Sequence, residues 1–374
     1  MHRIDLPSLG PGSPMFILKH VFDGGVNTKS AYIQAGMHAN EQPSLLVANH
    51  LLKLLARLDS ESKILGRVVV TPYANPIGLA QKVLGEFPGR FYLQDGTNFN
   101  RSFPAIDDGI RNAVSARSYS RNDIGAFKEL FQFEITKVKA VDPAAFLKKT
   151  LLQEAFKHDV VIDLHCANKS VLFVVGKSKH ASRVLALAQS VCARAVVLEE
   201  RLAGSPIDES FDSAWETLRE LGLVDEEHQG FVAVIEHRGQ ADMMDDVAHE
   251  DAIGIIRFLA KEGLVQWNED AEHAIDTDIP VYPFAGNEHV YCEATGLIVF
   301  HKKPGEMVAK GDKYAEIVQL DSQLDSERIP VLSNIDGMVI DTHRTQVVRA
   351  GQKIAWLAGH ELLSDPKNPG IMGP

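Results

Sequence analysis

The stretch Ala31-Tyr-Ile-Gln-Ala-Gly-Met-His-Ala-Asn-Glu-Gln-Pro-Ser-Leu-Leu46 contains the signals of a strand, a turn and a helix. Residues 31–35 are largely apolar and are followed by a glycine, which is typical of a buried strand that ends in a turn. Pro43 suits the first position of a helix, and leucines continue on a helical period to Leu58. The stretch therefore predicts one strand–helix unit.

The same alternation continues along the chain. Short runs rich in β-branched residues predict strands at 16–18, 67–71, 159–164, 195–198 and 231–235. Amphipathic patterns predict helices at 43–58, 143–157, 181–193, 211–221 and 246–260, and 107–142 is interpreted as an insertion with some helix. Buried strands that alternate with amphipathic helices predict an α/β fold, in which helices pack in layers against a sheet.

Length and charge limit the classes of protein that this chain can represent. Its 374 residues suggest about two domains. The formal charge is 38 − 50 = −12, which argues against nucleic acid as a partner. The sequence has neither the roughly 18 continuous apolar residues of a membrane helix nor the apolar core of a signal peptide at its N-terminus. Three scattered cysteines do not form a disulfide framework, so we expect a cytoplasmic protein.

The last hundred residues contain a weak internal repeat. Three segments recur at offsets of 41, 40 and 40 residues: 296–301 with 337–342, 308–313 with 348–353, and 315–317 with 355–357. Short strands with glycine turns at a fixed spacing predict two similar β halves packed together. We therefore divide the chain into domains 1–275 and 276–374, with the boundary near 270–280.

This repeat resembles the lipoyl/biotinyl-type barrel-sandwich domain. In that family the modified lysine lies at the hairpin tip between the two halves. The corresponding segment here, Leu320–Arg328, has no lysine. We expect a structural or lid role for this domain rather than a carrier role.

Two segments supply candidate metal ligands. His38 and Glu41 are spaced i, i+3 between the first strand and its helix, and an imidazole and a carboxylate on one face can share a metal ion. His165 follows the apolar run 159–164, which places it at the carboxyl end of a strand, where α/β sheets bind ligands. Together they form a His₂Glu set, the donor pattern of catalytic zinc sites. We place Asp163 on the opposite face of its strand and leave it out of the set.

Two further segments supply candidates for catalysis and binding. Glu236 closes an apolar strand, where a carboxylate is costly to bury without a role. It could act as a general base, or it could form a structural ion pair with Arg238 or another arginine. Arg101 carries a planar fork that can hold a carboxylate through two hydrogen bonds, and the neighbouring Asn100 adds an amide donor.

The order His-x-x-Glu, Asn-Pro (Asn75), Asn-Arg, His, Glu resembles the succinylglutamate desuccinylase/aspartoacylase family, relatives of the zinc carboxypeptidases. The resemblance implies a three-layer α/β/α mixed sheet of the zinc-carboxypeptidase type with a small C-terminal β domain. It also implies one Zn²⁺ per chain. The residues that it assigns are His38, Glu41 and His165 as zinc ligands, Glu236 as the catalytic glutamate, and Asn100 and Arg101 as the substrate-carboxylate pair.

One position departs from the family pattern. Aspartoacylase-like members carry an arginine just after the Asn-Pro turn, which helps to polarise the scissile carbonyl. This sequence has Ile77 there. Arg90 and Arg238 are the candidates that could replace it.

These observations predict a zinc-dependent amidohydrolase that cleaves an N-acyl amino acid or a related small amide. Two alternatives remain open: a metallocarboxypeptidase acting on peptide C-termini, and a non-catalytic carboxylate-binding module on the same fold. In the main hypothesis the partner is a small molecule with a free carboxylate, not a nucleic acid or a membrane. A homo-oligomer is compatible with the sequence.

Overall fold

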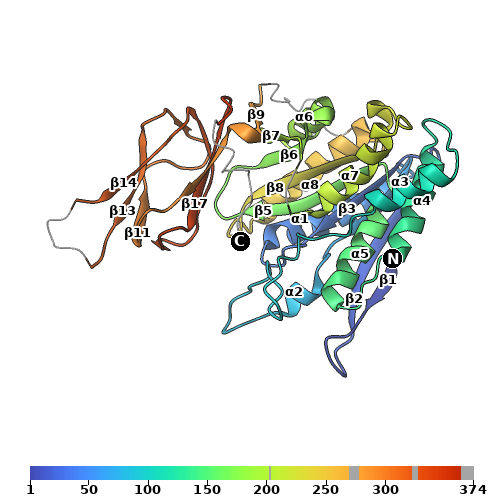
Figure 1. Ribbon diagram of the computed structural model, residues 1–374, viewed down its shortest axis with the longest axis horizontal. Coiled ribbons are helices and arrows are strands. Elements are labelled where there is room, and N and C mark those ends of the chain that lie inside the picture. The colour runs from blue at the N-terminus through green and yellow to red at the C-terminus, as the bar shows by residue number, and fades with distance from the viewer. Residues whose placement is uncertain (202–203, 269–277, 322–326, 364–374) are drawn as a thin grey trace. The chain divides into compact units, whose positions relative to one another are not determined.

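The computed structural model describes residues 1–201, 204–268, 278–321 and 327–363 (Figure 1). The chain divides into two compact units. The first comprises 1–165, 204–235 and 243–275, and the second comprises 166–203, 236–242 and 276–374. The domain boundary expected at residue 275 lies outside the described residues, as do positions 322–326 of the predicted hairpin tip.

The sheet of the first unit is mixed. The strand β1 (His2–Leu6) pairs antiparallel with β2 (Met15–Asp23), which pairs antiparallel with β4 (Arg67–Thr71). The strands β4 and β5 (Val160–Ala167) flank β3 (Ser30–Ala35) and run parallel to it. Because β3 is buried along its whole length, its sequence is a nearly continuous apolar run rather than an alternating one.

Two groups of helices cover this sheet. The helix α1 (Gln42–Ser60) packs on α8 (Asp245–Lys261) and against β3 and β4. A second group contacts a different set of strand side chains, including Tyr32 and Val161. Its members are α3 (Asp107–Ala116), α4 (Ile124–Lys137), α5 (Pro143–Ala155) and α7 (Ile207–Glu220). The layered mixed α/β fold that the sequence predicts is confirmed.

Local sequence explains where these helices begin. The Asp142 side chain accepts hydrogen bonds from the backbone N–H groups of Ala144 and Ala145, and Pro143 occupies the first turn of α5. The short helix α2 (Pro76–Ala80) begins in the same way, because the Asn75 side chain accepts from the Gly78 N–H. Both aspartate and asparagine thus satisfy N–H groups that the helix itself leaves without a partner.

The second unit contains a parallel strand group and two antiparallel sheets. The strands β6 (Phe173–Lys177), β7 (Ala195–Glu199) and β9 (Val281–Pro283) run parallel, with α6 (Ala181–Ser190) against the first two. One antiparallel sheet has the order β10 (Asn287–Tyr291), β17 (Lys353–Gly359), β15 (Gly337–Thr342), β12 (Met307–Val308). The other has the order β14 (Ile329–Leu332), β13 (Lys313–Val318), β11 (Gly296–Phe300), β16 (Val347–Val348).

The two halves of the sequence repeat exchange strands. The strand β12 of the first half pairs with β15 of the second, and β16 of the second half pairs with β11 of the first. Both halves contribute side chains to one apolar core, including Ile298 and Ile317 from the first and Val339 and Leu357 from the second. The halves are therefore parts of one folded body, as the repeat predicted.

Within the second unit, the chain just after β5 is bonded to β15. Backbone N–H groups of Asn168 and Lys169 donate to Asp341 Oδ1 at 3.1 and 3.0 Å. The Thr342 N–H donates to the Lys169 carbonyl oxygen at 2.9 Å. Burial, opposed by Lys353 and these donors, raises the pKa of Asp341 to about 6. A buried carboxyl thus connects the segment after β5 to the C-terminal sheet.

None of the helices in the described part of the chain combines the length and the apolar character that crossing a membrane would require.

Candidate metal centre

The turn after β3 places His38 and Glu41 at the start of α1. Gly36 has φ +71°, and a Cβ there would lie 2.4 Å from Leu45 Cδ2, so the turn requires glycine. The Asn75 side chain donates to the Met37 carbonyl oxygen at 2.9 Å, and the Glu41 N–H donates to the His38 carbonyl oxygen at 3.0 Å. The Asn-Pro turn that the sequence singled out therefore supports the backbone beside His38.

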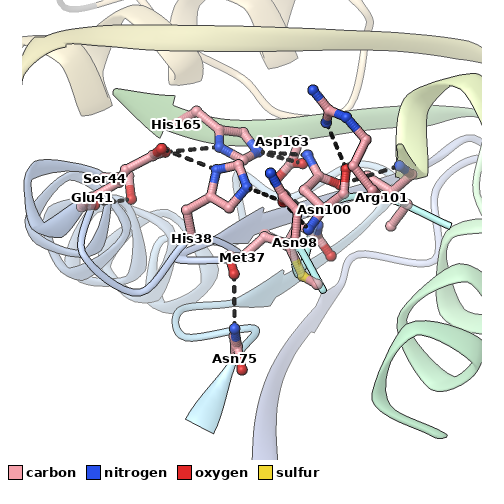
Figure 2. Close-up of polar contacts among 12 residues, drawn as sticks. Met37, His38, Glu41, Ser44, Asn75, Asn98, Asn100, Arg101, Asp163 and His165 are labelled. Carbon is pink, nitrogen blue, oxygen red and sulfur yellow. Dashed lines mark hydrogen bonds and ion pairs between the residues drawn. The ribbon is translucent and has the colours of Figure 1, made fainter. Parts of the chain in front are cut away.

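The three predicted ligands converge on one point (Figure 2). Glu41 offers one carboxylate oxygen to each imidazole: Oε1 lies 3.0 Å from His38 Nδ1, and Oε2 lies 2.8 Å from His165 Nδ1. One ligand atom from each residue lies within 4.8 Å of the others. All three residues are buried, at 3% exposure each. Segments 124 residues apart in sequence thus form one cluster.

The outer nitrogen of each imidazole faces an oxygen acceptor. His38 Nε2 lies 2.8 Å from Asn98 Oδ1, and His165 Nε2 lies 2.8 Å from Asp163 Oδ2. Gln34, which is paired with Asp163 in register, donates to Asp163 Oδ1 at 3.1 Å. Such outer hydrogen bonds fix the tautomer of a metal-binding histidine and leave the other nitrogen to the metal.

The placement of Asp163 on the opposite face from His165 is wrong. Side chains alternate along a strand with a period of two, so residues 163 and 165 share a face of β5. The contact between Asp163 and His165 follows directly from that geometry. Asp163 supports a ligand instead of pointing away from it.

Burial and charge set the ionisation of the cluster. Burial lowers the pKa of His38 to about 4, with Arg90 contributing, so this imidazole is neutral near pH 7. Burial opposes a charge on His165, but the carboxylates of Asp163 and Glu41 outweigh it and raise the pKa of His165 well above its usual value. Burial also opposes ionisation of Glu41, whereas the two histidines lower its pKa. A metal ion that binds here must displace the proton of His165.

The donor set suits a divalent ion of the zinc type. Two imidazole nitrogens and a carboxylate converge, both imidazoles have an acceptor on the outer nitrogen, and the three side chains are removed from bulk water. Three protein ligands of these types are the donor set of catalytic zinc sites. The residues present therefore fit the metal that the family resemblance implies.

The predicted carboxylate-binding pair lies next to this cluster. Asn100 Oδ1 accepts from the Ile207 N–H at 3.2 Å, which turns Nδ2 toward His165 Nε2, 3.2 Å away. Arg101 Nη1 donates to the Asn100 carbonyl oxygen at 2.7 Å. Gly204 closely approaches Arg101, because a Cβ there would lie 2.8 Å from Arg101 Cδ. Their role in substrate binding stays a prediction.

Arg90 contacts two of the candidate metal ligands directly. Its Nη1 lies 3.2 Å from both Glu41 Oε1 and His38 Nδ1. The hydrogen bond from the Ala39 N–H to the Gly89 carbonyl oxygen, at 2.9 Å, joins the two loops. By contrast, Ile77 is completely buried in the apolar core. A cation therefore reaches the site from residue 90, not from the position after the Asn-Pro turn.

The other two predicted residues lie on β8 (Phe231–Gly239). Glu236 is buried, at 8% exposure. Arg238 is partly buried and has φ +43°, an uncommon conformation for a non-glycine residue, and its carbonyl oxygen accepts from Ser170 Oγ at 3.0 Å. The catalytic role of Glu236 and the binding role of Arg238 stay predictions.

Sequence reasoning missed Asn98 and Gln34 as partners of the cluster. The sequence Asn98-Phe-Asn100-Arg contained a signal for Asn98. An asparagine side chain commonly accepts a hydrogen bond from the backbone N–H two residues further along the chain, and here that is the N–H of Asn100. Gln34 was visible as the one polar residue inside an apolar strand.

Comparisons with known proteins identify a family that part of the chain resembles. Residues 27–138 match the model of the Succinylglutamate desuccinylase/Aspartoacylase catalytic domain. That segment contains His38, Glu41, Asn100 and Arg101, whereas His165 and Glu236 lie beyond it. Residues 27–138 are thus similar to the catalytic domain of this family, and the resemblance inferred above is confirmed over that segment. The family match supports an enzyme that acts on amides. No curated protein matches the chain.

Solved structures extend the likeness to the whole chain. A succinylglutamate desuccinylase/aspartoacylase family protein from Shewanella amazonensis SB2B has a TM-score of 0.81 and 23% identity, with 96% of this chain and 98% of that chain covered. One from Shewanella frigidimarina NCIMB 400 has a TM-score of 0.82 and 21% identity, with 96% of each covered. The ectoine utilization protein EutE (DoeB) from Ruegeria pomeroyi has a TM-score of 0.64 and 18% identity, with 96% and 95% covered. These similarities establish a common fold.

Proposed function

We propose that this protein is a zinc-dependent amidohydrolase that cleaves the amide bond of an N-acyl amino acid or a related small amide. The observation that carries the proposal is the convergence of His38, Glu41 and His165 with an acceptor on the outer nitrogen of each imidazole. Zinc, when bound by these three residues, supplies a Lewis acid and lowers the pKa of a coordinated water toward about 7.

The remaining steps belong to side chains of the chain itself. Asn100 and Arg101 bind the free carboxylate of the substrate, and this fixes the position of its amide. Arg90 donates to the amide oxygen as negative charge develops there, since its guanidinium already lies 3.2 Å from Glu41 Oε1. Glu236 takes a proton from the attacking water and delivers it to the leaving amine. The products are a carboxylic acid and an amino acid or amine.

A substrate panel tests the proposal. The protein is purified, its zinc content is measured, and N-acyl amino acids and short peptides are offered in parallel. Zinc with turnover of acyl amino acids supports the proposal. Release of C-terminal residues from peptides would instead identify a metallocarboxypeptidase, and no turnover on either panel, with zinc bound, would identify a carboxylate-binding module.

The catalytic glutamate requires a separate experiment. In Glu236→Gln we expect zinc content to remain and kcat to fall by at least about a hundredfold, because the amide cannot accept the water proton. Glu129→Gln, an exposed glutamate on α4, is the matched control and should keep wild-type kcat. Near-normal turnover in Glu236→Gln would remove this residue from the mechanism.

A further inference from the structure

The side-chain oxygen of Asn98 is shared by two hydrogen bonds. The backbone N–H of Asn100 donates to Asn98 Oδ1 at 2.9 Å. Because a backbone N–H can only donate, the atom that it faces is the amide oxygen and not the amide nitrogen. The orientation of the Asn98 side chain is therefore fixed by its own turn.

That orientation determines the tautomer of His38. Since Asn98 Oδ1 can only accept, the hydrogen in the 2.8 Å contact resides on His38 Nε2. Arg90 gives an independent indication, because its Nη1 can only donate and lies 3.2 Å from His38 Nδ1. Both neighbours leave the lone pair on Nδ1, the nitrogen that faces Glu41.

Asn98 differs from the partner of the other imidazole. Asp163 is a carboxylate on the strand β5 and is paired with Gln34 on β3. Asn98 is a neutral amide at the beginning of the turn that leads to Arg101. Its own carbonyl oxygen accepts from the Arg101 N–H at 3.2 Å and from the buried Lys148 Nζ at 3.3 Å. The turn is thus held from the protein interior as well as from the metal side.

We propose that Asn98 is a positioning residue that joins metal binding to recognition of the substrate carboxylate. One oxygen atom orients His38 for the metal and, through the Asn100 N–H, sets the start of the Asn100–Arg101 turn. This inference rests on the proposed zinc site and deepens it. Loss of the Asn98 side chain weakens both functions together, although Asn98 itself touches neither the metal nor the reacting atoms.

Zinc affinity, measured by competition with a chromogenic chelator, gives the first readout. We expect Asn98→Ala to bind zinc about 10–100-fold more weakly than wild type, the usual effect of removing an outer hydrogen-bond partner of a ligand. Asn98→Asp should restore the zinc affinity to within a few-fold of wild type, because a carboxylate oxygen accepts from both His38 Nε2–H and the Asn100 N–H. Asn27→Ala is the matched control. Asn27 Oδ1 also accepts from the N–H two residues ahead, at 3.0 Å, but in an exposed turn away from the cluster.

Two further readouts separate positioning from folding. The KM of Asn98→Ala for an N-acyl amino acid should rise, and Asn98→Asp should reverse part of that rise. Side-chain nitrogen NMR of the metal-free protein should show an Nε2–H tautomer at His38 in wild type and in Asn98→Asp, and a smaller fraction of that tautomer in Asn98→Ala, where only Arg90 still favours it. Wild-type zinc affinity in Asn98→Ala would overturn the inference. So would an equal fall in the melting temperatures of metal-free Asn98→Ala and metal-free Asn98→Asp relative to metal-free wild type. If wild-type protein itself binds no zinc, the proposed function fails instead.

Discussion

At the scale of single residues, the cation that contacts the predicted metal ligands comes from an unexpected segment. Ile77 occupies the position where the family resemblance implies an arginine, and it is packed in the core. Arg90 arrives from the following loop and contacts Glu41 and His38. A guanidinium at this place can donate to a carbonyl oxygen as readily as that of an arginine at position 77. Only the position of the guanidinium relative to the carbonyl oxygen matters to the chemistry.

Substitution of Arg90 tests this role. We expect Arg90→Gln to lower kcat about 10²–10³-fold, the usual effect of removing one donor to a developing oxyanion. Zinc affinity should stay equal or increase, because the variant lacks a positive charge beside two ligands. Steady-state kinetics and chelator competition check both expectations, and Arg111→Gln, which affects a surface ion pair with Glu220, is the control. An unchanged kcat would show that another residue stabilises the developing oxyanion.

A second prediction at this scale concerns Asp341. Its pKa in the folded protein is about 6, above the ordinary 3.8, so the folded state retains this proton to higher pH than the unfolded state does. The free energy of unfolding should therefore fall between about pH 4 and pH 6, by up to about 3 kcal/mol from this group. Asp341→Asn keeps an oxygen acceptor for the Asn168 and Lys169 N–H groups but loses the titration.

Urea denaturation of both proteins across pH 4–7.5 measures the difference. The unfolding free energy of Asp341→Asn minus that of wild type should increase with pH over this window and then level off. A difference that stays constant over this pH range would contradict the raised pKa.

Sequence could predict that His38, Glu41 and His165 come together because each occurs where strand and helix signals are strong. His38 and Glu41 lie between a strand and a proline-initiated helix, and His165 ends an apolar run. It could not predict which groups face the outer nitrogens. Asn98 reaches His38 across 60 residues, through a turn whose course depends on tertiary contacts with Lys148 and Ile207.

At the scale of elements, the loop that carries Arg101 is paired with a second turn. The Ser102 and Phe103 N–H groups donate to the carbonyl oxygens of Gly204 and Ser205 at 2.7 and 2.9 Å. Gly204 has φ +86° and lies against the stem of Arg101. The two turns therefore position the guanidinium jointly, and a side chain at residue 204 would displace it.

We expect Gly204→Ala to raise KM for a carboxylate-bearing substrate roughly tenfold, because the added Cβ would lie 2.8 Å from Arg101 Cδ and would displace the guanidinium, a loss of about 1.4 kcal/mol of binding. Zinc affinity should change little. Gly222→Ala is a matched control, since Gly222 has φ +73° but no atom lies within 4 Å of the place that a Cβ would take. It carries similar backbone strain without a contact to Arg101. An equal rise of KM in both variants would show that strain alone is responsible.

The predicted elements with long periodic patterns are confirmed, and their ends differ by a few residues. Helices expected at 43–58 and 246–260 correspond to α1 and α8, and the strand expected at 159–164 extends to 167 as β5. The strands β1 and β6 are not among the elements that the sequence predicted. The strand β1 is mostly exposed at the sheet edge, so it has little apolar pattern, and it depends on pairing with β2 for its conformation.

At the scale of the whole molecule, zinc should contribute to folding stability as well as to chemistry. An ion that binds only the folded chain stabilises it by about 4 kcal/mol when its free concentration is about a thousand times Kd. We expect metal-free protein to melt at a lower temperature than the zinc-loaded form, as measured by calorimetry with and without a chelator. His165→Ala should show little dependence on zinc. A melting temperature that is independent of zinc in wild type would argue against the site.

The repeat of the C-terminal part is the large-scale feature that sequence captured best. Spacing alone indicated two similar β halves, and the structure shows them exchanging β12 and β16. Sequence did not indicate that residues 166–203 form one compact unit with those halves. That association depends on backbone hydrogen bonds, such as the one from Thr342 to Lys169, which leave no mark on side-chain patterns.

The attachment of residues 168–171 to β15 has a practical consequence for protein engineering. A gene shortened to stop near codon 275 would delete the acceptor of the Asn168 and Lys169 N–H groups, only a few residues beyond His165. It would also remove Ile340, whose carbonyl oxygen accepts from the Val171 N–H at 3.2 Å. Residues 166–203 therefore depend on the C-terminal sheet, and chimeras that exchange the C-terminal part between relatives should transfer these residues along with it.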